Sequence, residues 1–385
     1  MGDVAVAVVQ PLVPHYRVPF FEALARREGI RLTVVADTHP LGSLTGIASS
    51  SVFPIEHAPH RSLGPFFLQR GTSSSARDPR FDVVVFNWSS RYPGLPRAVR
   101  RAARSGKGVV LWGHGFGITR PGLGHLVRDR LVRWADVCLL YGPTARESLI
   151  RRGLPADKLL VAPNAVDQEP IREATAHWTA SDRLVRFRES VGVARRPVML
   201  YLSRLESDKR PELVLEALAL LRGRDPEPMA VFIGGGGQQH ILRKRAASLG
   251  LEASVRFLGP EYDEMRIAPW ALNSRCVVHP GKLGLTIFHA FGYGLPVVTG
   301  RDPRRQAPEV EALCDDGNGL LYEDGSVDDL AAQVGRLLAD DDLHRRLSKG
   351  ARDTVRGSGG RTLEAMVEGF VAGVRLAAER ARARR

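Results

Sequence analysis

The sequence has few of the features that mark disulfide-stapled or membrane-spanning proteins. It has only 3 cysteines, Cys138, Cys276 and Cys314. They are odd in number, far apart and in no C-x-x-C pair, so neither a disulfide framework nor a structural zinc site is expected. No run of about eighteen consecutive apolar residues occurs, and no basic stretch precedes the apolar amino-terminal run, so the sequence supports neither a membrane span nor a signal peptide. We therefore expect a protein of the reducing cytoplasm.

The composition that remains is that of a folded globular protein. Hydrophobic residues make up 44% of the 385 residues and charged residues 25%. These values exclude a mostly disordered chain and a collagen-like repeat. A chain of this length is expected to form two domains rather than one core.

The positive charge is concentrated in the first half of the chain. The formal net charge is +13, and residues 61–133 alone contain 14 Lys and Arg against 3 Asp and Glu. Such a one-sided positive field would attract an anionic surface, either phospholipid or nucleic acid. The alternative is that these arginines only form a solvated surface.

Apolar, β-branched runs alternate with helix-like stretches in the first part of the chain. Such runs are typical of strands buried on both faces, as in a parallel sheet covered by helices. Residues 19–29 begin with a helix-compatible proline and end at a glycine, and residues 123–135 place apolar side chains on one helical face. Repeated βα units predict a doubly wound α/β lobe. The predicted strands are 4–10, 31–36, 82–86, 108–112 and 137–142.

A second series of the same kind begins after residue 195 and predicts a second doubly wound lobe. Residues 166–190 have no clear strand pattern and are expected to link the lobes. The expected fold class is therefore α/β, with two Rossmann-like lobes facing across a cleft that can hold two ligands. The expected domains are 1–168, 169–355 and 356–385. The last is expected to be a helix, and one option is that it crosses back to the first lobe.

The segment YLSRLESDKRPE, 201–212, places two cations in a strand-to-helix loop. A strand ends near Ser203 and a helix begins near Pro211, so Arg204 and Lys209 project from the loop between them. Arginine offers a rigid fork of donors and lysine a compact charge, which together suit a diphosphate and the charge that grows on a leaving phosphate. The alternative is that both are ordinary solvated side chains.

The segment HPGKLGLTIFHAFGYGLP, 279–296, is a glycine-containing loop that leads into a helix. Gly281 and Gly284 let the backbone approach a ligand closely, and a helix that begins near Leu285 would turn its free N–H groups and positive dipole end toward an anion. His289 lies one helical turn further along. Without other context, the favoured interpretation of His289 is a hydrogen-bonded histidine of a buried helix.

These segments, in this order, resemble the carboxyl-terminal half of family-4 glycosyltransferases of GT-B fold. The similar stretches are VAPNAVD (161–167), YLSRLESDKRPELVLEAL, VFIGGGG, VRFLG, HPGKLGLTIFHAFGYGLPVV and DDGNGLLYEDGSVDDLAAQVGRLL. In the first half, PHYRVPFFEAL (14–24), WGHG (112–115) and RWADVCLLYGPTARESLIRRG (133–153) are likewise similar to nucleotide-sugar-dependent members. The resemblance covers almost the whole chain.

By position, the resemblance implies which residues would form the site. Arg204 and Lys209 match the pair that holds the donor diphosphate, and His114 matches a histidine beside the reacting sugar, so these three are the expected catalytic residues. The first lobe would bind the acceptor and the second the donor, with residues 257–265 at the edge that binds the base. The expected donor-binding residues are Arg204, Lys209, Gly234, Leu258, Gly281, Lys282, Gly284, Leu285, Thr286 and His289; the expected acceptor-side residues are His15, Tyr16 and Arg17; no metal ligand is expected.

Gly281 and His289 depart from the family pattern, which usually has a glutamate at both of these positions. The first glutamate lies near the hydroxyls of the donor sugar and the second binds the nucleotide ribose. A histidine can still form a hydrogen bond with a ribose hydroxyl, whereas Gly281 would leave the sugar side open. The departure therefore bears on the identity of the donor more than on activity.

The resemblance implies an enzyme, a hexosyltransferase-like glycosyltransferase that retains the anomeric configuration. It would move a sugar from a nucleoside diphosphate sugar, with a UDP-sugar slightly favoured, to a hydroxyl of a glycan, a lipid-linked saccharide or a small-molecule natural product. No cofactor or metal is expected, because Arg204 and Lys209 already offset the charge of the diphosphate. The acidic run at 340–342 is interpreted as a helix cap or a solvated face.

Two other interpretations stay open at this point. A nucleotide-sugar epimerase or a phosphorylase would share the two-lobed scaffold. A nucleic-acid-binding protein is suggested only by the pI of about 10.2, without a recognisable reader motif.

The expected partners are the donor, the acceptor and an anionic membrane surface, and no nucleic acid is expected. The basic residues of 61–133 and the helix at 123–134 would contact the membrane surface. The expected location is the cytoplasm, either free or peripheral on the inner face of the membrane.

Overall fold

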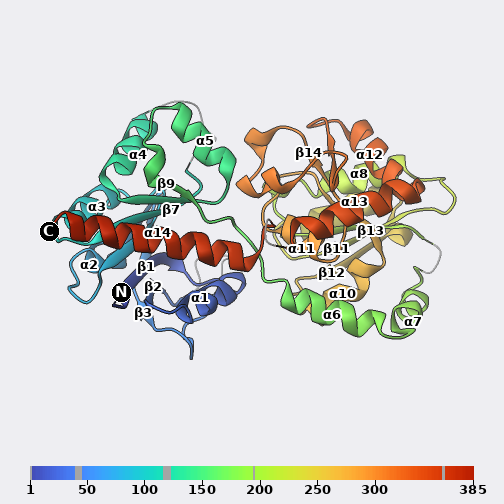
Figure 1. Cartoon of the computed structure of the whole chain (residues 1–385). Helices are drawn as coiled ribbons and strands as arrows, with labels where there is room; N and C mark the ends of the chain where they lie inside the picture. The colour runs from blue at the N-terminus through green and yellow to red at the C-terminus, as the bar shows by residue number, and fades with distance from the viewer. Residues whose placement is uncertain (1, 40–45, 116–122, 194–195, 358–359) are drawn as a thin grey trace. The chain divides into compact units, whose positions relative to one another are not determined.

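A computed structural model describes residues 2–39, 46–115, 123–193, 196–357 and 360–385 of the chain. It forms two compact units (Figure 1). The first consists of residues 1–164 together with Leu363–Arg385, and the second consists of Ala165–Thr362. Each unit has its own parallel sheet and its own covering helices.

The first unit contains a seven-stranded sheet in which all neighbouring strands run parallel. Its central strands are continuous runs of buried Val, Leu and Ala, as expected for a sheet that is covered on both faces. In spatial order the strands are β3 (Ile55–His57), β2 (Ile30–Asp37), β1 (Val4–Leu12), β6 (Val83–Asn87), β7 (Gly108–Gly113), β8 (Val137–Leu140) and β9 (Leu159–Val161).

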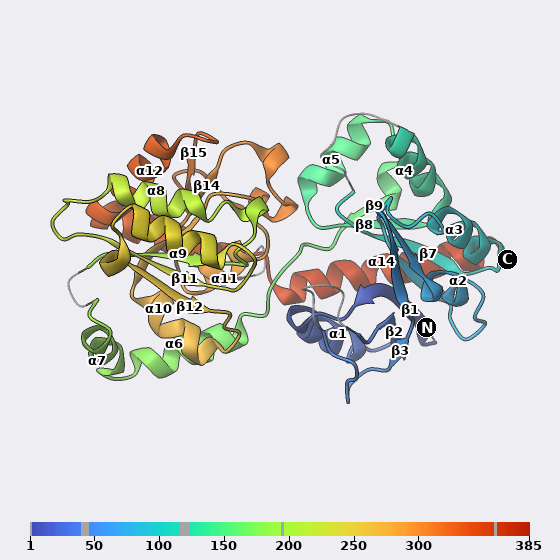
Figure 2. The same cartoon turned by 180° about the vertical axis from the view of Figure 1, so that it is seen from behind.

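Helices cover both faces of this sheet (Figures 1 and 2). The first helix α1 (Val18–Ala25) and the last helix α14 (Leu363–Ala383) pack together on one face, where the rings of Phe20, Trp112 and Phe370 are in contact. The opposite face carries α2 (Arg70–Ser75), α3 (Leu95–Arg104), α4 (Leu123–Trp134) and α5 (Pro143–Arg151). An antiparallel hairpin of β4 (His60–Leu63) and β5 (Phe66–Gln69) stands apart from the sheet.

The second unit contains a six-stranded sheet that is also wholly parallel. In spatial order its strands are β12 (Val255–Gly259), β11 (Met229–Ile233), β10 (Val198–Leu202), β13 (Ser274–His279), β14 (Val297–Gly300) and β15 (Gly319–Tyr322). The two sheets confirm the predicted α/β class with two doubly wound lobes. The short 3-10 helices of both units are η1 (His15–Arg17), η2 (Ala156–Lys158), η3 (Ser207–Lys209), η4 (Glu252–Ser254), η5 (Pro303–Arg305) and η6 (Pro308–Ala312).

The helices of the second unit form two apolar cores, one on each face of the sheet. One core is built with α8 (Glu212–Leu220), α9 (Gln239–Ser248) and α12 (Val327–Ala339). The other is built with α6 (Glu169–Thr179), α10 (Glu264–Leu272) and α11 (Thr286–Gly292). Two further helices, α7 (Arg183–Ser190) and α13 (Asp341–Thr354), complete the unit.

The segment 166–190 differs from the expectation that it only links the lobes. It contains α6 and α7, which pack within the second unit. The indole N–H of Trp178 donates to the carbonyl of Met265 (2.8 Å), and its ring meets Phe187 edge-on. Few apolar residues hold these helices in place, which is why the sequence pattern did not show them.

Of the helices in the described part of the chain, none combines the length and the apolar character that a bilayer span requires.

Candidate active site

Two loops meet at the carboxyl edge of the second sheet, between its adjacent central strands β10 and β13. The strand order reverses there, because β11 and β12 lie beyond β10 whereas β14 and β15 lie beyond β13. In open α/β sheets such a reversal leaves a crevice in which ligands bind. The loop after β10 spans residues 203–211 and the loop after β13 spans residues 280–285. The two motifs of the sequence analysis are therefore neighbours.

Lys209 joins these two loops. Its Nζ donates a hydrogen bond to the carbonyl of Lys282 (2.7 Å) and lies 3.5 Å from Asp208 Oδ2. The N–H of Lys282 in turn donates to the carbonyl of Asp208 (2.9 Å). Only 13% of the Lys209 side chain is exposed, whereas Lys282 is an exposed residue. The charge of Lys209 is therefore held at a fixed place where the loops meet.

Gly281 allows the loops to approach this closely. A Cβ at position 281 would lie 2.4 Å from the carbonyl oxygen of Asp208 and 2.4 Å from the carbonyl carbon of Lys209. Only glycine, which has no Cβ, fits at that separation. The backbone of the other loop therefore fills the space beside the Cα of Gly281, where the sequence analysis expected an open sugar side.

The electrostatic surroundings of Lys209 include a buried histidine that the sequence analysis did not single out. Burial lowers the pKa of Lys209 below its ordinary value; Asp208 opposes this shift. His279 is fully buried and its ring stacks on Tyr201. Burial, and then the charge of Lys209, lower the pKa of His279 to about 4. His279 is therefore neutral near pH 7 and does not compete for an anion.

Arg204 stands exposed at the start of the loop after β10. Its carbonyl accepts a hydrogen bond from the hydroxyl of Tyr201 (2.9 Å), which holds the backbone at this point. Gly234, which follows β11, has a φ of 150°, and a Cβ there would lie 1.9 Å from the carbonyl oxygen of Ser203. The glycine therefore permits the close packing of two strand ends next to Arg204.

Gly284, Leu285 and Thr286 lead from the second loop into α11. All three are partly exposed, and a Cβ at Gly284 would meet nothing within 4 Å. The helix begins at Thr286 but has only 7 residues. Because the dipole of an exposed helix end contributes only about 0.3–1 kcal/mol, the fixed charges of Arg204 and Lys209 are the stronger attraction for an anion.

His289 contacts a carboxylate that the sequence analysis did not name. Its Nε2 lies 2.8 Å from one oxygen of Glu264 and 2.9 Å from the other. The hydroxyl of Tyr293 donates to the same carboxylate (2.6 Å). Burial raises the pKa of Glu264, but the bonds from His289 and Tyr293 outweigh it, so the net shift is downward and the carboxylate is ionised. A glutamate from α10 thus lies at the position where α11 lacks one.

The expected base-binding edge, residues 257–265, runs from the outermost strand of the sheet, β12, into the start of α10 and contains Glu264. Leu258 on this strand is 41% exposed. The adjacent Phe257 stacks on Phe232, and the guanidinium of Arg243 lies over its ring. Contacts of this kind are ordinary for an edge strand, and they do not indicate which ligand Leu258 would bind.

In the first unit, the predicted catalytic histidine and one acceptor-side residue gather around Tyr141. His114 directly follows β7, is exposed, and meets the Tyr141 ring edge-on with centroids 4.8 Å apart. The guanidinium of Arg17 lies over the rings of Trp112 (5.1 Å) and Tyr141 (5.6 Å). The structure therefore places His114 and Arg17 against the same tyrosine at the carboxyl edge of the first sheet.

The other acceptor-side residues flank this group. His15 and Tyr16 are exposed in η1, whereas Arg17 is only 8% exposed and its Nη1 donates to Met366 Sδ (3.4 Å). A guanidinium remains charged at any physiological pH. Arg17 thus holds a permanent positive charge among aromatic rings beside His114.

The acidic run at 340–342 caps a helix, as expected. Asp340 Oδ1 accepts the N–H of Leu343 (2.9 Å) at the start of α13, and Asp341 forms an ion pair with Arg275 (2.7 Å). The first contact is an N-cap of the ordinary kind.

Two family models match the chain. The model described as Glycosyl transferases group 1 matches residues 186–354, and the model described as Glycosyltransferase Family 4 matches residues 20–170. The first match contains both loops of the second unit, and the second contains His114.

The chain is also similar to named bacterial proteins. A GDP-mannose-dependent alpha-(1-6)-phosphatidylinositol monomannoside mannosyltransferase of Mycolicibacterium smegmatis is 32% identical over 269 residues, which cover 67% of this chain and 68% of that protein. A D-inositol 3-phosphate glycosyltransferase of Geodermatophilus obscurus is 30% identical over 247 residues, which cover 61% of this chain and 51% of that protein. Among solved structures, HepE of Anabaena in complex with UDP aligns with a TM-score of 0.68 at 20% identity, covering 99% of this chain and 100% of that one.

Proposed function

Since the chain belongs to glycosyltransferase family 4 and has the GT-B fold, it is a retaining, nucleotide-sugar-dependent glycosyltransferase, and we propose that Arg204 and Lys209 hold the diphosphate of its donor. The expected family, fold and enzyme class are confirmed. The observation that carries the proposal is the meeting of two loops where the strand order of the second sheet reverses, with the charge of Lys209 fixed between them.

The proposed chemistry is a substitution at the anomeric carbon with retention of configuration. The bond from the anomeric carbon to the β-phosphate oxygen breaks, and its electron pair stays on the phosphate. The acceptor hydroxyl forms the new bond from the same face, and its proton passes to the departing phosphate oxygen. In the transition state the sugar is oxocarbenium-like and the departing phosphate gains negative charge. The cations of Arg204 and Lys209 therefore stabilise the transition state more than they stabilise the ground state.

The proposed partner of the nucleotide ribose is the pair of His289 and Glu264. When the Nε2–H of His289 donates to the Glu264 carboxylate, its Nδ1 is left as an acceptor for a hydroxyl. The Tyr293 hydroxyl on the same carboxylate fixes the arrangement further. The pair would thereby take the part of the glutamate that other family members carry on this helix.

In the first unit, the proposed catalytic residue is His114, and the proposed acceptor-side residues are His15, Tyr16 and Arg17. His114 and Arg17 share the Tyr141 ring as a support, which limits their side-chain motion. A fixed cation beside a histidine suits an acceptor that carries an anionic group near its reacting hydroxyl.

Donor binding is tested by thermal unfolding of the full chain with a panel of uridine, guanosine, adenosine and thymidine diphosphate sugars. A ligand that binds only the folded state raises the midpoint temperature. We expect one base to give the largest rise, and the corresponding nucleoside without phosphates to give little. The proposal is overturned if no member of the panel shifts the midpoint more than its bare nucleoside does.

The lowered pKa of Lys209 predicts an alkaline limit to donor affinity. A lysine is charged below its pKa and neutral above it, and burial places the pKa of Lys209 below its ordinary value of 10.5. Donor affinity, measured by calorimetry, should therefore begin to fall at a lower pH than it would if the lysine were exposed. A Lys209→Arg variant, which stays charged, controls for titration of the nucleotide base and should lack this fall. The same fall in both proteins would contradict the assignment.

The proposed acceptor is lipid-linked, because one face of the first unit is suited to an anionic membrane. A cavity of about 650 Å³ beside α3 has no Asp or Glu in its described lining. The exposed arginines around it are Arg77, Arg97, Arg100, Arg101 and Arg104. Five fixed positive charges on one surface attract anionic headgroups at about 1 kcal/mol each.

The hairpin of β4 and β5 adds exposed apolar side chains to this face. Leu63 is 65% exposed, and Phe66 and Leu68 are each 47% exposed. The cavity beneath the hairpin shares Ser73 and Gly94 with the arginine-lined cavity, so the two surfaces are continuous. Apolar tips beside basic residues are the combination that binds a lipid interface.

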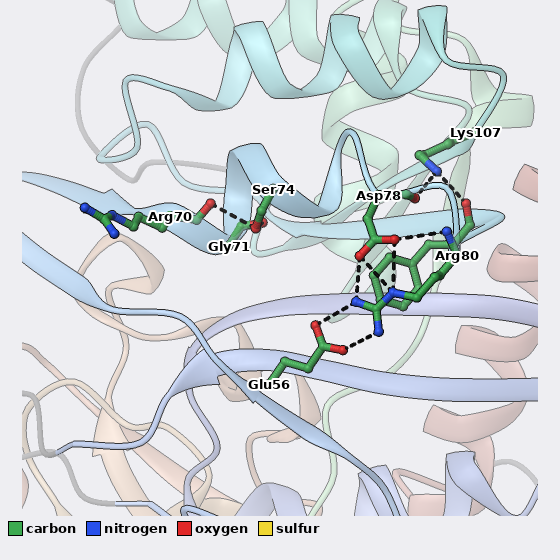
Figure 3. A network of polar contacts seen from close by, with 8 residues as sticks. Glu56, Arg70, Gly71, Ser74, Asp78, Arg80 and Lys107 are labelled. Atoms are coloured by element: carbon green, nitrogen blue, oxygen red, sulfur yellow. Dashed lines mark hydrogen bonds and ion pairs between the residues drawn. The ribbon is translucent and has the colours of Figure 1, made fainter.

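Not every basic side chain of residues 61–133 is available to a membrane. Figure 3 shows that Arg80 and Lys107 have internal partners. Arg80 pairs with Glu56 (2.9 Å) and Asp78 (2.6 Å), and Lys107 donates to the carbonyl of Phe81 (2.7 Å). The membrane contact is therefore assigned to the arginines of α3 and to the hairpin. The proposed side is the cytoplasmic face of the membrane, because unpaired cysteines such as the exposed Cys314 are stable in a reducing compartment.

Vesicle co-sedimentation tests this face. We expect the wild-type chain to bind vesicles that contain phosphatidylglycerol and to bind neutral phosphatidylcholine vesicles weakly, with the difference shrinking as salt rises. An Arg97→Glu/Arg101→Glu variant should bind anionic vesicles at least about tenfold more weakly. The control variant, Lys244→Glu/Arg382→Glu, makes the same charge change elsewhere. Equal loss in both variants, or no preference for anionic vesicles, would instead favour a soluble small-molecule acceptor.

A further inference from the structure

A buried carboxylate lies at the carboxyl end of β2 in the first unit, next to the first residue of the β4–β5 hairpin. Asp37 is the last residue of this strand, and its side chain is only 7% exposed. Its Oδ2 accepts the N–H of His60 (2.7 Å) and its Oδ1 accepts the N–H of His39 (3.0 Å). Two backbone donors therefore fix the orientation of the carboxylate.

Two imidazoles turn toward the same carboxylate oxygen. His39 Nδ1 lies 3.2 Å and His57 Nδ1 lies 3.8 Å from Asp37 Oδ1. The two rings meet edge-on with centroids 5.3 Å apart, and the three donor atoms all lie within 4.8 Å of one another. Donor atoms that bind one zinc ion tetrahedrally at about 2.0–2.2 Å are about 3.3–3.5 Å apart. The two separations from Asp37 Oδ1, 3.2 and 3.8 Å, are close to this value.

Among the residues that the structure describes, Asp37 has no ion-pair partner with a permanent charge. The backbone N–H groups of His60 and His39 donate to this carboxylate. Within the described residues, its ion-pair partners are His39 and His57, which carry charge only when protonated. Buried charges in proteins are usually paired or bound to a metal. Asp37, His39 and His57 therefore offer donor atoms to a cation, and a bound cation would supply a counter-charge to the carboxylate.

We propose that Asp37, His39 and His57 bind one divalent metal ion of the zinc class. Two imidazoles and one carboxylate are a ligand set for zinc and its neighbours rather than for magnesium or calcium, and solvent would complete the coordination. The hydroxyl of Thr38, which lies 2.9 Å from His57 Nδ1, gives up that contact when the metal binds. Because His57 is the last residue of β3, the ion links the ends of two adjacent strands. It takes no part in the sugar transfer.

The test is metal binding by the full chain after treatment with a chelator. Addition of Co²⁺ should give the visible absorption bands of a low-coordinate site that saturate near one equivalent, and Zn²⁺ should displace them. His39→Ala and His57→Ala should each weaken Co²⁺ binding at least about tenfold. Both histidines are exposed, so these variants should keep the unfolding midpoint of the metal-free protein.

The matched control is His240→Ala, which removes an exposed histidine from the second unit. It should bind Co²⁺ as the wild type does. The proposal is overturned if the wild type binds no Co²⁺, or if His39→Ala and His57→Ala bind it as tightly as His240→Ala does.

Discussion

Replacing Lys209 by alanine is expected to lower turnover by about 10²-fold or more, because it removes the positive charge that we propose faces the leaving diphosphate. The side chain also joins two loops through its bond to the Lys282 carbonyl. The measurement is the steady-state rate of nucleoside diphosphate release, with kcat and KM for the donor determined separately. A charge that acts mainly in the transition state should lower kcat more than it raises KM.

Lys244→Ala is the control for this variant. Lys244 is an exposed lysine of α9 in the same unit, so its loss should leave kcat and KM unchanged. If Lys209→Ala retained near-normal turnover, the diphosphate would have to be held elsewhere, and the assignment of the two loops would be wrong.

Replacing Gly281 by alanine is expected to harm both stability and donor binding. The added Cβ would meet the backbone of Asp208 and Lys209 at 2.4 Å, and backbone atoms cannot swing aside as the end of a side chain can. Such overpacking typically lowers the free energy of unfolding by about 1–3 kcal/mol. The loops must move apart, so donor affinity should fall at least about tenfold. Denaturant unfolding and calorimetry measure the two effects.

Gly281→Glu extends this test to the residue that the family usually carries. If the position merely lacked a carboxylate, the glutamate would improve donor binding; our account predicts that it is at least as harmful as alanine. Gly284→Ala is the matched control for stability, because a Cβ at Gly284 meets nothing within 4 Å. A stable Gly281→Glu protein with improved turnover would refute the account of this loop.

The strands of both sheets could be predicted where they are continuous buried runs. β1, β6 and β7 consist mainly of Val, Ala, Leu, Phe and Trp, a composition that few helices share. The three-residue strands β3 and β9 are too short to give a periodic signal. The hairpin was missed because His60–Leu63 is polar and exposed, so its pairing depends on the turn and on Phe67 packing against Arg91.

The candidate site was predictable to the extent that its residues follow strands in sequence. Arg204 and Lys209 come directly after β10, and Gly281 comes directly after β13. The role of Gly281 was not predictable, because the clash that excludes a side chain arises only once the two loops are packed together. Glu264 was missed for a similar reason: it lies on α10 and reaches His289 on α11 only through the packing of the second unit.

The most direct test of the central claim is calorimetric binding of a nucleoside, its monophosphate and its diphosphate to the wild-type chain and to Lys209→Ala. The base is the one that gives the largest thermal shift. If the loops hold the diphosphate, the second phosphate should raise the affinity of the wild type at least about tenfold, and most of that gain should vanish in the variant. Equal affinities for the three ligands in the wild type, or an undiminished gain in the variant, would contradict it.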